Sequence, residues 1–125
     1  MSSLFIEQDV KQSGPDVEVL GLAYDSRAVK PGFLFAALKG SQGDGRAHVQ
    51  DALARGAVAV LSGEAIGEES VTNIVADNPR RALAVAASVF HGHCDQRLKM
   101  IGITGTNGKT TVSHLVEGML DFADL

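Results

Sequence analysis

Short blocks of apolar and polar residues follow one another along the chain and predict strands and helices in turn. Compact apolar runs bounded by glycine or polar residues predict strands over 17–26, 31–40, 57–61, 71–76 and 98–104. Helical spacing of apolar residues predicts helices over 43–56, 77–92 and 109–122, and a short opening helix over 4–10. Strands that alternate with helices indicate an α/β fold with a small, mostly parallel or mixed sheet flanked by helices.

A polar, turn-rich stretch over 92–97 precedes the last predicted strand. We expect a domain boundary there, with one small domain over 1–96. Residues 97–125 would then supply only the first strand, glycine-rich loop and helix of a second, truncated domain. His91, His93 and Cys94 lack the further ligands that a zinc site needs, so we interpret them as a solvated helix end.

Composition narrows the class of protein. With 45% hydrophobic and 21% charged residues, the 125-residue chain is typical of a soluble globular protein. A formal net charge of −4 disfavours nucleic-acid binding, and no apolar run is long enough to span a membrane. The N-terminus lacks the pattern of a secretory signal, and the single cysteine, Cys94, fits a reducing compartment. We therefore expect a cytoplasmic protein.

The sequence ITGTNGKTT over 103–111 has the residues of a phosphate-binding loop between a strand and a helix. Glycines let backbone N–H groups turn inward, and the start of the helix adds unpaired N–H donors. Lys109 supplies a positive charge for the β- and γ-phosphates, and the Thr110 hydroxyl is a candidate Mg²⁺ ligand. Because Ile103 replaces the first glycine of the strict pattern, a plain glycine turn is the alternative. The expected ATP-binding residues are Gly105, Thr106, Asn107, Gly108, Lys109, Thr110 and Thr111.

Three stretches together resemble the Mur ligases: YDSRAVKPGFLFAALKG over 24–40, SQGDGR over 41–46 and IGITGTNGKTT over 101–111. The resemblance covers nearly the whole chain and is closest to the members that add a diamino acid to UDP-N-acetylmuramoyl-L-alanyl-D-glutamate. It implies a three-domain, ATP-dependent ligase of peptidoglycan synthesis, of which this chain holds the UDP-binding domain and the start of the ATPase domain. In such a ligase Mg-ATP phosphorylates the side carboxylate of D-glutamate, and the diamino acid's amine attacks the acyl phosphate. Lys109 would stabilise the transferred phosphoryl group and is the expected catalytic residue.

The resemblance also implies a UDP site. Tyr24 and Ser26 correspond to a turn that contacts uridine, and Ser41, Gln42 and Gly43 to a loop that contacts uracil and diphosphate. Ser41 stands where the family commonly has histidine, which weakens a side-chain contact at that position. Taken without the resemblance, the same turn can be a surface Asx turn in which Arg27 pairs with Asp25 or Asp44.

The letters Asp-Asn-Pro-Arg over 77–80 match the motif with which the family recognises diaminopimelate, but that motif lies in its C-terminal domain. In this chain they begin a helix, with Asp77 or Asn78 as the cap and Pro79 in the first turn. We therefore interpret them as a helix start that carries no information on the amino-acid substrate.

Two other functions stay open: a stand-alone UDP-sugar-binding module, and another amide ligase of the same superfamily. A different P-loop enzyme, such as a kinase, is disfavoured because no strand follows the loop to complete a nucleotide-binding sheet. For the ligase we expect UDP-N-acetylmuramoyl-dipeptide and ATP as ligands. The diamino acid, diaminopimelate or lysine, would bind only in the full-length enzyme. We expect no reaction by the 125 residues alone.

Overall fold

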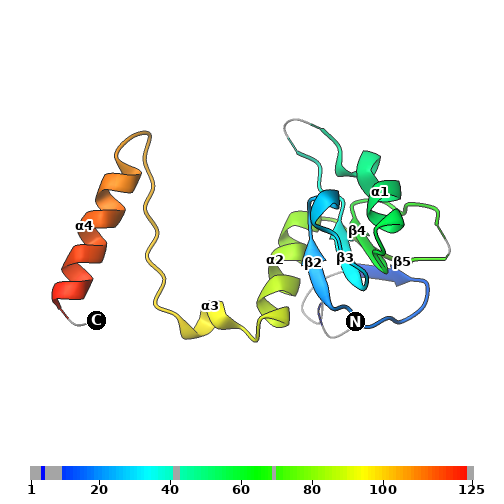
Figure 1. The fold of residues 1–125 in the computed structure, drawn as a ribbon, viewed down its shortest axis with the longest axis horizontal. Helices are drawn as coiled ribbons and strands as arrows, with labels where there is room; N and C mark the ends of the chain where they lie inside the picture. The colour runs from blue at the N-terminus through cyan, green and yellow to red at the C-terminus, as the bar shows by residue number, and fades with distance from the viewer. Residues whose placement is uncertain (1–3, 5–9, 41–42, 69, 124–125) are drawn as a thin grey trace. The chain divides into compact units, whose positions relative to one another are not determined.

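The chain divides into two compact units, Met1–Cys94 and Asp95–Leu125, in a computed structural model that describes residues 4, 10–40, 43–68 and 70–123. The first unit contains a five-stranded sheet with helices, and the second contains a long helix and the segment before it (Figure 1). The division falls near the polar stretch at which we expect a boundary. The roles expected for the two parts, UDP binding and ATP binding, stay predictions.

The sheet is mixed and mostly parallel, as predicted. Its order is β1-β5-β4-β3-β2, in which β2 to β5 run parallel and β1 pairs antiparallel with β5 at one edge. The inner strands are almost continuous buried runs, as expected of parallel strands covered on both faces. The strands are β1 (Val10–Ser13), β2 (Gly21–Ala23), β3 (Phe33–Ala36), β4 (Ala59–Ser62) and β5 (Thr72–Ala76).

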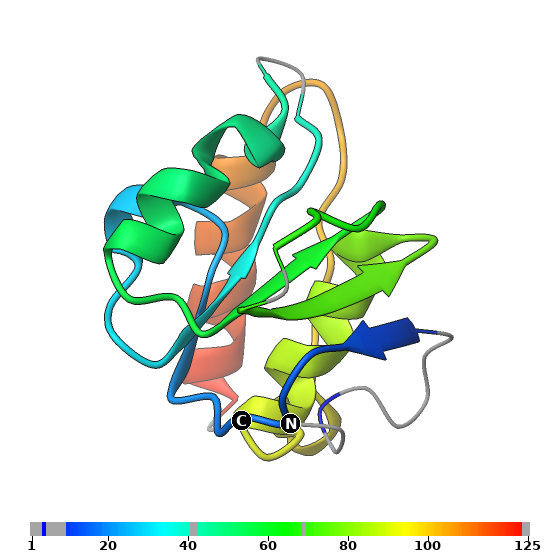
Figure 2. The same cartoon turned by 90° about the vertical axis from the view of Figure 1, so that its right-hand side faces the viewer.

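Helices cover both faces of the sheet, so the first unit has three layers (Figure 2). Successive side chains of a strand point to opposite faces. Leu34 and Leu61 therefore pack on the side of α2 (Pro79–Phe90). Phe35 packs on the other side, with α1 (Val49–Ala54). All three side chains are fully buried, which makes the sheet the core of this unit.

The helix α2 begins where the sequence predicts. The Oδ1 of Asn78 accepts a hydrogen bond from the Arg81 N–H at 3.0 Å, and Pro79 occupies the first turn. Asn78 is therefore the cap, and Asp77 is not. Gly92, with a φ of +68°, follows the C-terminal end in the left-handed conformation that suits glycine.

The helix predicted over 43–56 is divided. It begins as a 3₁₀ turn, in which the Asp44 side chain accepts from the Arg46 N–H, and continues as α1. The helix is closed at Gly56, as predicted, because a φ of +97° takes the backbone out of the helical conformation. Glycine is required at this position, since a Cβ there would lie 2.9 Å from Pro31 Cα. The other helical elements are η2 (Ser26–Ala28), η3 (Gly45–His48), α3 (Cys94–Arg97) and α4 (Lys109–Phe122).

Some predictions of secondary structure are wrong. The segment 98–104 forms no strand among the described residues, because no neighbouring strand there satisfies its backbone groups. The strands expected over 17–26 and 31–40 shrink to β2 and β3. Val10, which we expected in an opening helix, is the first residue of β1; residues 5–9 of that expected helix lie outside the described residues.

Candidate functional site

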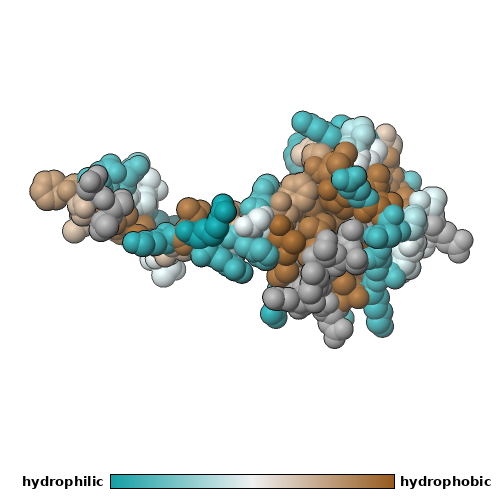
Figure 3. Space-filling model, turned by 90° about the horizontal axis from the view of Figure 1, so that it is seen from below, coloured by the Kyte–Doolittle hydropathy of each residue, from teal (hydrophilic) through white to brown (hydrophobic). Residues whose placement is uncertain are grey.

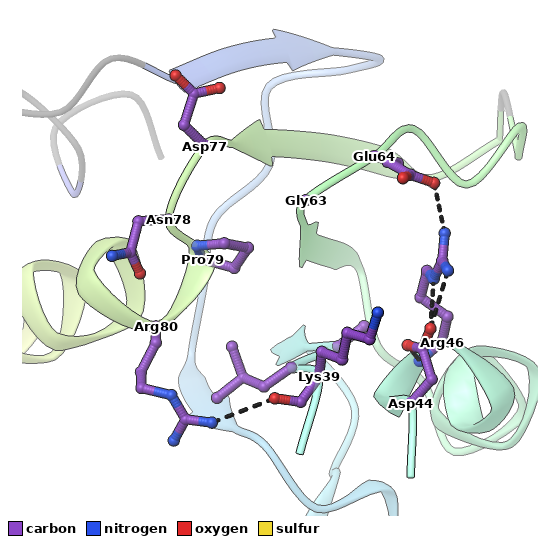
Figure 4. A pocket seen from close by; sticks show the side chains of 11 residues that line it. Lys39, Asp44, Arg46, Gly63, Glu64, Asp77, Asn78, Pro79 and Arg80 are labelled. Atoms are coloured by element: carbon purple, nitrogen blue, oxygen red, sulfur yellow. Dashed lines mark hydrogen bonds and ion pairs between the residues drawn. The ribbon is translucent and has the colours of Figure 1, made fainter. Parts of the chain in front are cut away.

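A polar cavity of about 350 Å³ lies at the carboxyl ends of three parallel strands, β3, β4 and β5 (Figure 4). The segments 37–39, 63–64 and 77–80, which follow these strands, form much of its wall. Open α/β sheets typically bind ligands at this edge. The charged residues that line the cavity are Lys39, Asp44, Arg46, Glu64, Asp77 and Arg80.

Arg46 is held between two carboxylates on one side of this cavity (Figure 4). Its Nη2 lies 2.8 Å from Asp44 Oδ2, and its Nη1 lies 2.5 Å from Glu64 Oε2. The hydrogen bond from the Arg46 side chain lowers the pKa of Asp44, and the charge of Lys39 adds a smaller effect in the same direction. Two carboxylates therefore neutralise Arg46, so this cation is poorly placed to attract an anionic ligand.

Arg80 lies on the opposite side of the cavity and differs from Arg46. Its Nη2 donates to the backbone carbonyl of Lys39 at 3.3 Å, and it has no carboxylate partner among the described residues. Figure 4 shows the Asp77 carboxylate directed away from it. Most donors of the Arg80 guanidinium therefore have no partner among the described residues.

An apolar cavity of about 450 Å³ adjoins the polar one, between the end of β2 and α2. Arg80 and Leu38 line both cavities. Tyr24, one of the predicted uridine contacts, lines the apolar cavity and is 74% exposed. The aliphatic lining comes mainly from Leu22, Ala23, Leu83, Ala84 and Ala87.

The turn after Tyr24 has the geometry of the Asx turn that the sequence allows. Asp25 accepts from the Arg27 N–H at 3.0 Å, and Arg27 Nη2 lies 2.7 Å from Asp25 Oδ2. The hydrogen bond from the Arg27 side chain is the main reason that the pKa of Asp25 falls to about 2. Ser26 is buried, and its hydrogen bond is the main cause that lowers the pKa of Asp51. The Ser26 hydroxyl thus faces α1, and Ser26 lines neither cavity.

The described residues on either side of the second predicted UDP-binding stretch are joined by backbone hydrogen bonds. Lys39 and Asp44 form an isolated antiparallel bridge, and the Gly40 N–H donates to the Gly43 carbonyl at 2.9 Å. Gly43 is exposed at this loop. Ser41 and Gln42, the other two predicted contacts, lie outside the described residues.

The seven predicted ATP-binding residues lie in the second unit, on the loop that leads into α4. Gly108 occupies the cap position of α4 with a φ of +75° and provides no side-chain acceptor for the first N–H groups of the helix. Thr110 and Thr111 belong to the first turn, and both are exposed. The helix start therefore presents unsatisfied donors of the kind that bind phosphate.

Lys109 folds back over its own loop. Its Nζ donates to the Gly105 carbonyl at 2.6 Å, four residues earlier. This contact holds a positive charge beside the N–H groups of the first helical turn, an arrangement that fits a polyphosphate. Among the described residues, no group of three or more histidine, cysteine, aspartate or glutamate side chains could hold a metal ion. The role of Thr110 toward Mg²⁺ stays a prediction.

The second unit buries none of the residues of α4. Figure 3 shows brown, hydrophobic atoms at its surface. One face of α4 adjoins Ile101 and Ile103 of the preceding segment. The large apolar side chains left exposed in this unit are Leu98, Met100, Ile101, Val112, Leu115, Met119 and Phe122. In the part of the chain that the structure describes, no helix is long and apolar enough to cross a membrane.

The chain matches a family model described as Mur ligase family, catalytic domain, over residues 18–103. The chain belongs to the Mur ligase family. A UDP-N-acetylmuramoyl-L-alanyl-D-glutamate–2,6-diaminopimelate ligase of Solibacter usitatus is 47% identical over 121 residues, which are 96% of this chain and 24% of that protein. A ligase of the same description from Brucella melitensis is 43% identical over 123 residues, or 97% of this chain and 25% of that protein. This Mur ligase chain thus spans about a quarter of the length of these relatives.

Solved structures of Mur ligases share the fold. MurF of Acinetobacter baumannii superposes with a TM-score of 0.71 at 24% identity, over 96% of this chain and 26% of that one. A 2,6-diaminopimelate ligase superposes with a TM-score of 0.64 at 31% identity, over 85% of this chain and 22% of that one. MurF of Thermotoga maritima, solved in complex with ADP, has a TM-score of 0.59 at 24% identity, over 86% and 24% of the two chains.

Arg80 was not among the site residues predicted from the sequence, although it lines both cavities. The helix-cap interpretation of 77–80 explains Asn78 and Pro79, but it does not explain the side chain of Arg80, which reaches Lys39. A usable signal was present, because Lys39 lies at the end of one predicted strand (31–40) and Arg80 follows another (71–76). The carboxyl ends of parallel strands lie at one edge of a sheet.

Proposed function

We propose that this Mur ligase chain forms the UDP-substrate-binding part, and the start of the ATP-binding part, of a ligase. The ligase would add a diamino acid to UDP-N-acetylmuramoyl-L-alanyl-D-glutamate in peptidoglycan synthesis. The observation that carries the proposal is the 47% identity, over 96% of the chain, to a ligase named for that reaction. A relative named UDP-N-acetylmuramyl-tripeptide synthetase leaves the diamino acid open between diaminopimelate and lysine.

The first unit is proposed to bind the UDP moiety. In support of this, the apolar cavity beside Tyr24 adjoins a polar cavity at the carboxyl ends of the sheet, and a nucleotide has an apolar base next to charged phosphates. The loop that bears Gly43 belongs to the same edge, since its flanking residue Lys39 lines the polar cavity. Ser26 would take part through its backbone or by exchanging its hydrogen bond to Asp51.

The second unit is proposed to hold the ATP phosphates. When bound, Mg-ATP would supply the phosphoryl group that activates the substrate carboxylate. Lys109 would exchange the Gly105 carbonyl for a phosphate oxygen, and the N–H groups of Thr110 and Thr111 would orient the phosphates. The exposed Thr110 hydroxyl would hold Mg²⁺. A MurF structure in complex with ADP supports nucleotide binding in this family.

Calorimetric titration of the 125-residue chain tests both assignments. We expect binding of UDP-N-acetylmuramoyl-dipeptide and weaker binding of Mg-ATP, the latter lost in Lys109→Ala. We also expect no release of phosphate from ATP when both ligands are present, because the chain spans only a quarter of its relatives. Tight ATP binding without binding of the UDP compound would reverse the assignment of the two units. Substrate-dependent phosphate release would show that the 125 residues act alone.

Binding of the UDP compound with no contribution to ligation in a longer chain would instead favour a stand-alone UDP-sugar-binding module. The MurF structures also leave room for another amide ligase of the family, since a MurF structure and the solved 2,6-diaminopimelate ligase are both 31% identical to this chain. Comparison of UDP-N-acetylmuramoyl-dipeptide with the corresponding tripeptide as ligands separates these possibilities.

A further inference from the structure

The two cavities of the first unit meet at one charged side chain. Arg80 and Leu38 are the residues that line both the polar and the apolar cavity. Leu38 is apolar, so Arg80 is the charged residue that lines both cavities. Neither the family relationship nor the sequence motifs assign a role to Arg80.

The charges around the polar cavity single out Arg80 further. Arg46 is neutralised by Asp44 and Glu64, at 2.8 and 2.5 Å. Lys39 also lines this cavity, and its charge has only a minor effect on the pKa of Asp44. By contrast, Arg80 has one hydrogen bond of 3.3 Å, to an uncharged backbone carbonyl, and no carboxylate partner among the described residues.

The geometry of Arg80 also allows a bound phosphate to replace the Lys39 carbonyl as its hydrogen-bond acceptor. Figure 4 shows its side chain extending from the first turn of α2 to the Lys39 carbonyl. A guanidinium has five N–H donors in a planar fork that matches two phosphate oxygens. A charge-assisted bond to phosphate is about twice as strong as one to a neutral carbonyl, so a phosphate would displace or share this contact.

We propose that Arg80 is a phosphate-binding residue of the nucleotide site, with the base in the apolar cavity and the diphosphate in the polar cavity. This inference rests on the proposed UDP-binding function and adds to it a residue and an orientation. The bound nucleotide places its uncharged base beside Tyr24 and Leu83, and its phosphates at the junction that Arg80 occupies. Because Arg80 also holds the Lys39 carbonyl, it links phosphate binding to the loop that carries Gly43.

Titration of the 125-residue chain with UDP and with uridine tests this role. We expect Arg80→Ala to weaken UDP binding about tenfold and to change uridine binding less than about twofold, since uridine has no phosphate. Arg80→Lys keeps the charge but loses the fork, so we expect a smaller loss for UDP. The matched control is Arg81→Ala, which removes a neighbouring exposed arginine on the same helix and should change neither affinity.

The outcomes separate the possible roles. Equal weakening of UDP and uridine by Arg80→Ala would mean that Arg80 only supports the loop, and would overturn the proposal. Equal UDP affinities of Arg80→Ala and Arg81→Ala would also overturn it, while leaving UDP binding by the first unit intact. No binding of UDP by the unaltered chain would overturn the proposed function, and this inference with it. Unchanged thermal unfolding of each variant verifies that the fold is retained.

Discussion

The two units of this chain use helices in opposite ways. In the first, α2 is capped by Asn78 and packs its small residues against a sheet whose inner strands are almost entirely buried. In the second, α4 is longer, yet it has no side-chain cap and no buried residue. Since isolated helices of this length are marginal in water, helical structure in α4 depends on what covers its apolar face. The first unit is therefore stabilised by its own core, whereas the second presents the proposed phosphate-binding loop at the start of a helix that has no buried residue.

The largest expected difference between the units is in hydrogen exchange. Amides of β4 (Ala59–Ser62) should exchange at least about a hundredfold more slowly than amides in the middle of α4, because β4 is fully buried and opens only when the unit unfolds. Exchange monitored by NMR on the 125-residue chain measures both. If the amides of β4 and α4 exchanged equally slowly in a monomeric sample, α4 would have a stable packing partner, contrary to the expected difference between the units.

Core truncation should also separate the units. Leu61→Ala removes a side chain with no exposed surface and should lower the free energy of unfolding by about 2–5 kcal/mol. The control is Leu115→Ala on α4, where the side chain is 63% exposed, and its effect should stay within about 0.5 kcal/mol. Denaturant unfolding followed by circular dichroism gives both values. If Leu115→Ala lowered the free energy of unfolding as much as Leu61→Ala, Leu115 would be packed against a partner, contrary to the expected difference between the units.

The helix cap provides a smaller test. Asn78→Ala should destabilise the first unit by about 1 kcal/mol, because the Arg81 N–H loses its acceptor. Asn78→Asp retains a side-chain oxygen at the cap and should restore most of this loss. Thermal unfolding of the unaltered chain, Asn78→Ala and Asn78→Asp measures these differences in stability. If aspartate fails to rescue stability, Asn78 contributes through something other than capping.

The smallest expected effect concerns Asp25 and pH. The folded-state pKa of Asp25 is about 2, below its ordinary value of 3.8, mainly because of the hydrogen bond from Arg27. A group with a depressed folded pKa stabilises the fold above its ordinary pKa, and that stability is lost as pH falls toward the folded value. The turn should therefore be intact at pH 5 and weaken between about pH 4 and pH 2. NMR titration of the Asp25 carboxyl tests this, and a midpoint near 4 would contradict it.

The sequence predicted the architecture better than the details, for physical reasons. Fully buried parallel strands are continuous apolar runs, so β4 and β5 were predicted within two residues of their bounds. The edge strand β1 was not, because its sequence VKQS is mostly exposed and pairs only on one side. The segment 98–104 has an apolar pattern typical of a strand, but pattern alone does not supply a partner.

In the candidate site, too, features set by contiguous residues could be predicted from the sequence, and features set by distant segments could not. Local motifs predicted the turn and the helix start that carry the proposed phosphate-binding residues, because these seven residues are contiguous. Their binding of phosphate stays a prediction. The junction at Arg80 combines segments that lie more than 40 residues apart, since Arg80 reaches Lys39. Only the parallel order of β3, β4 and β5 brings these segments to one edge, and no single stretch of sequence contains that information.

The antiparallel pairing of β1 with β5 has a consequence for how the first unit is made. Val10 pairs with Ala76, so the strand synthesised first finds its partner only after every other strand of the sheet has left the ribosome. The parallel strands β2 to β5 can assemble in the order of synthesis, whereas β1 must wait, and such long-range pairing slows folding. Until then the segment 10–13 is open to other extended chains. A ribosome that pauses before β5 emerges would leave this segment unpaired for longest, which makes the emergence of β5 the step that commits the nascent chain to its own sheet.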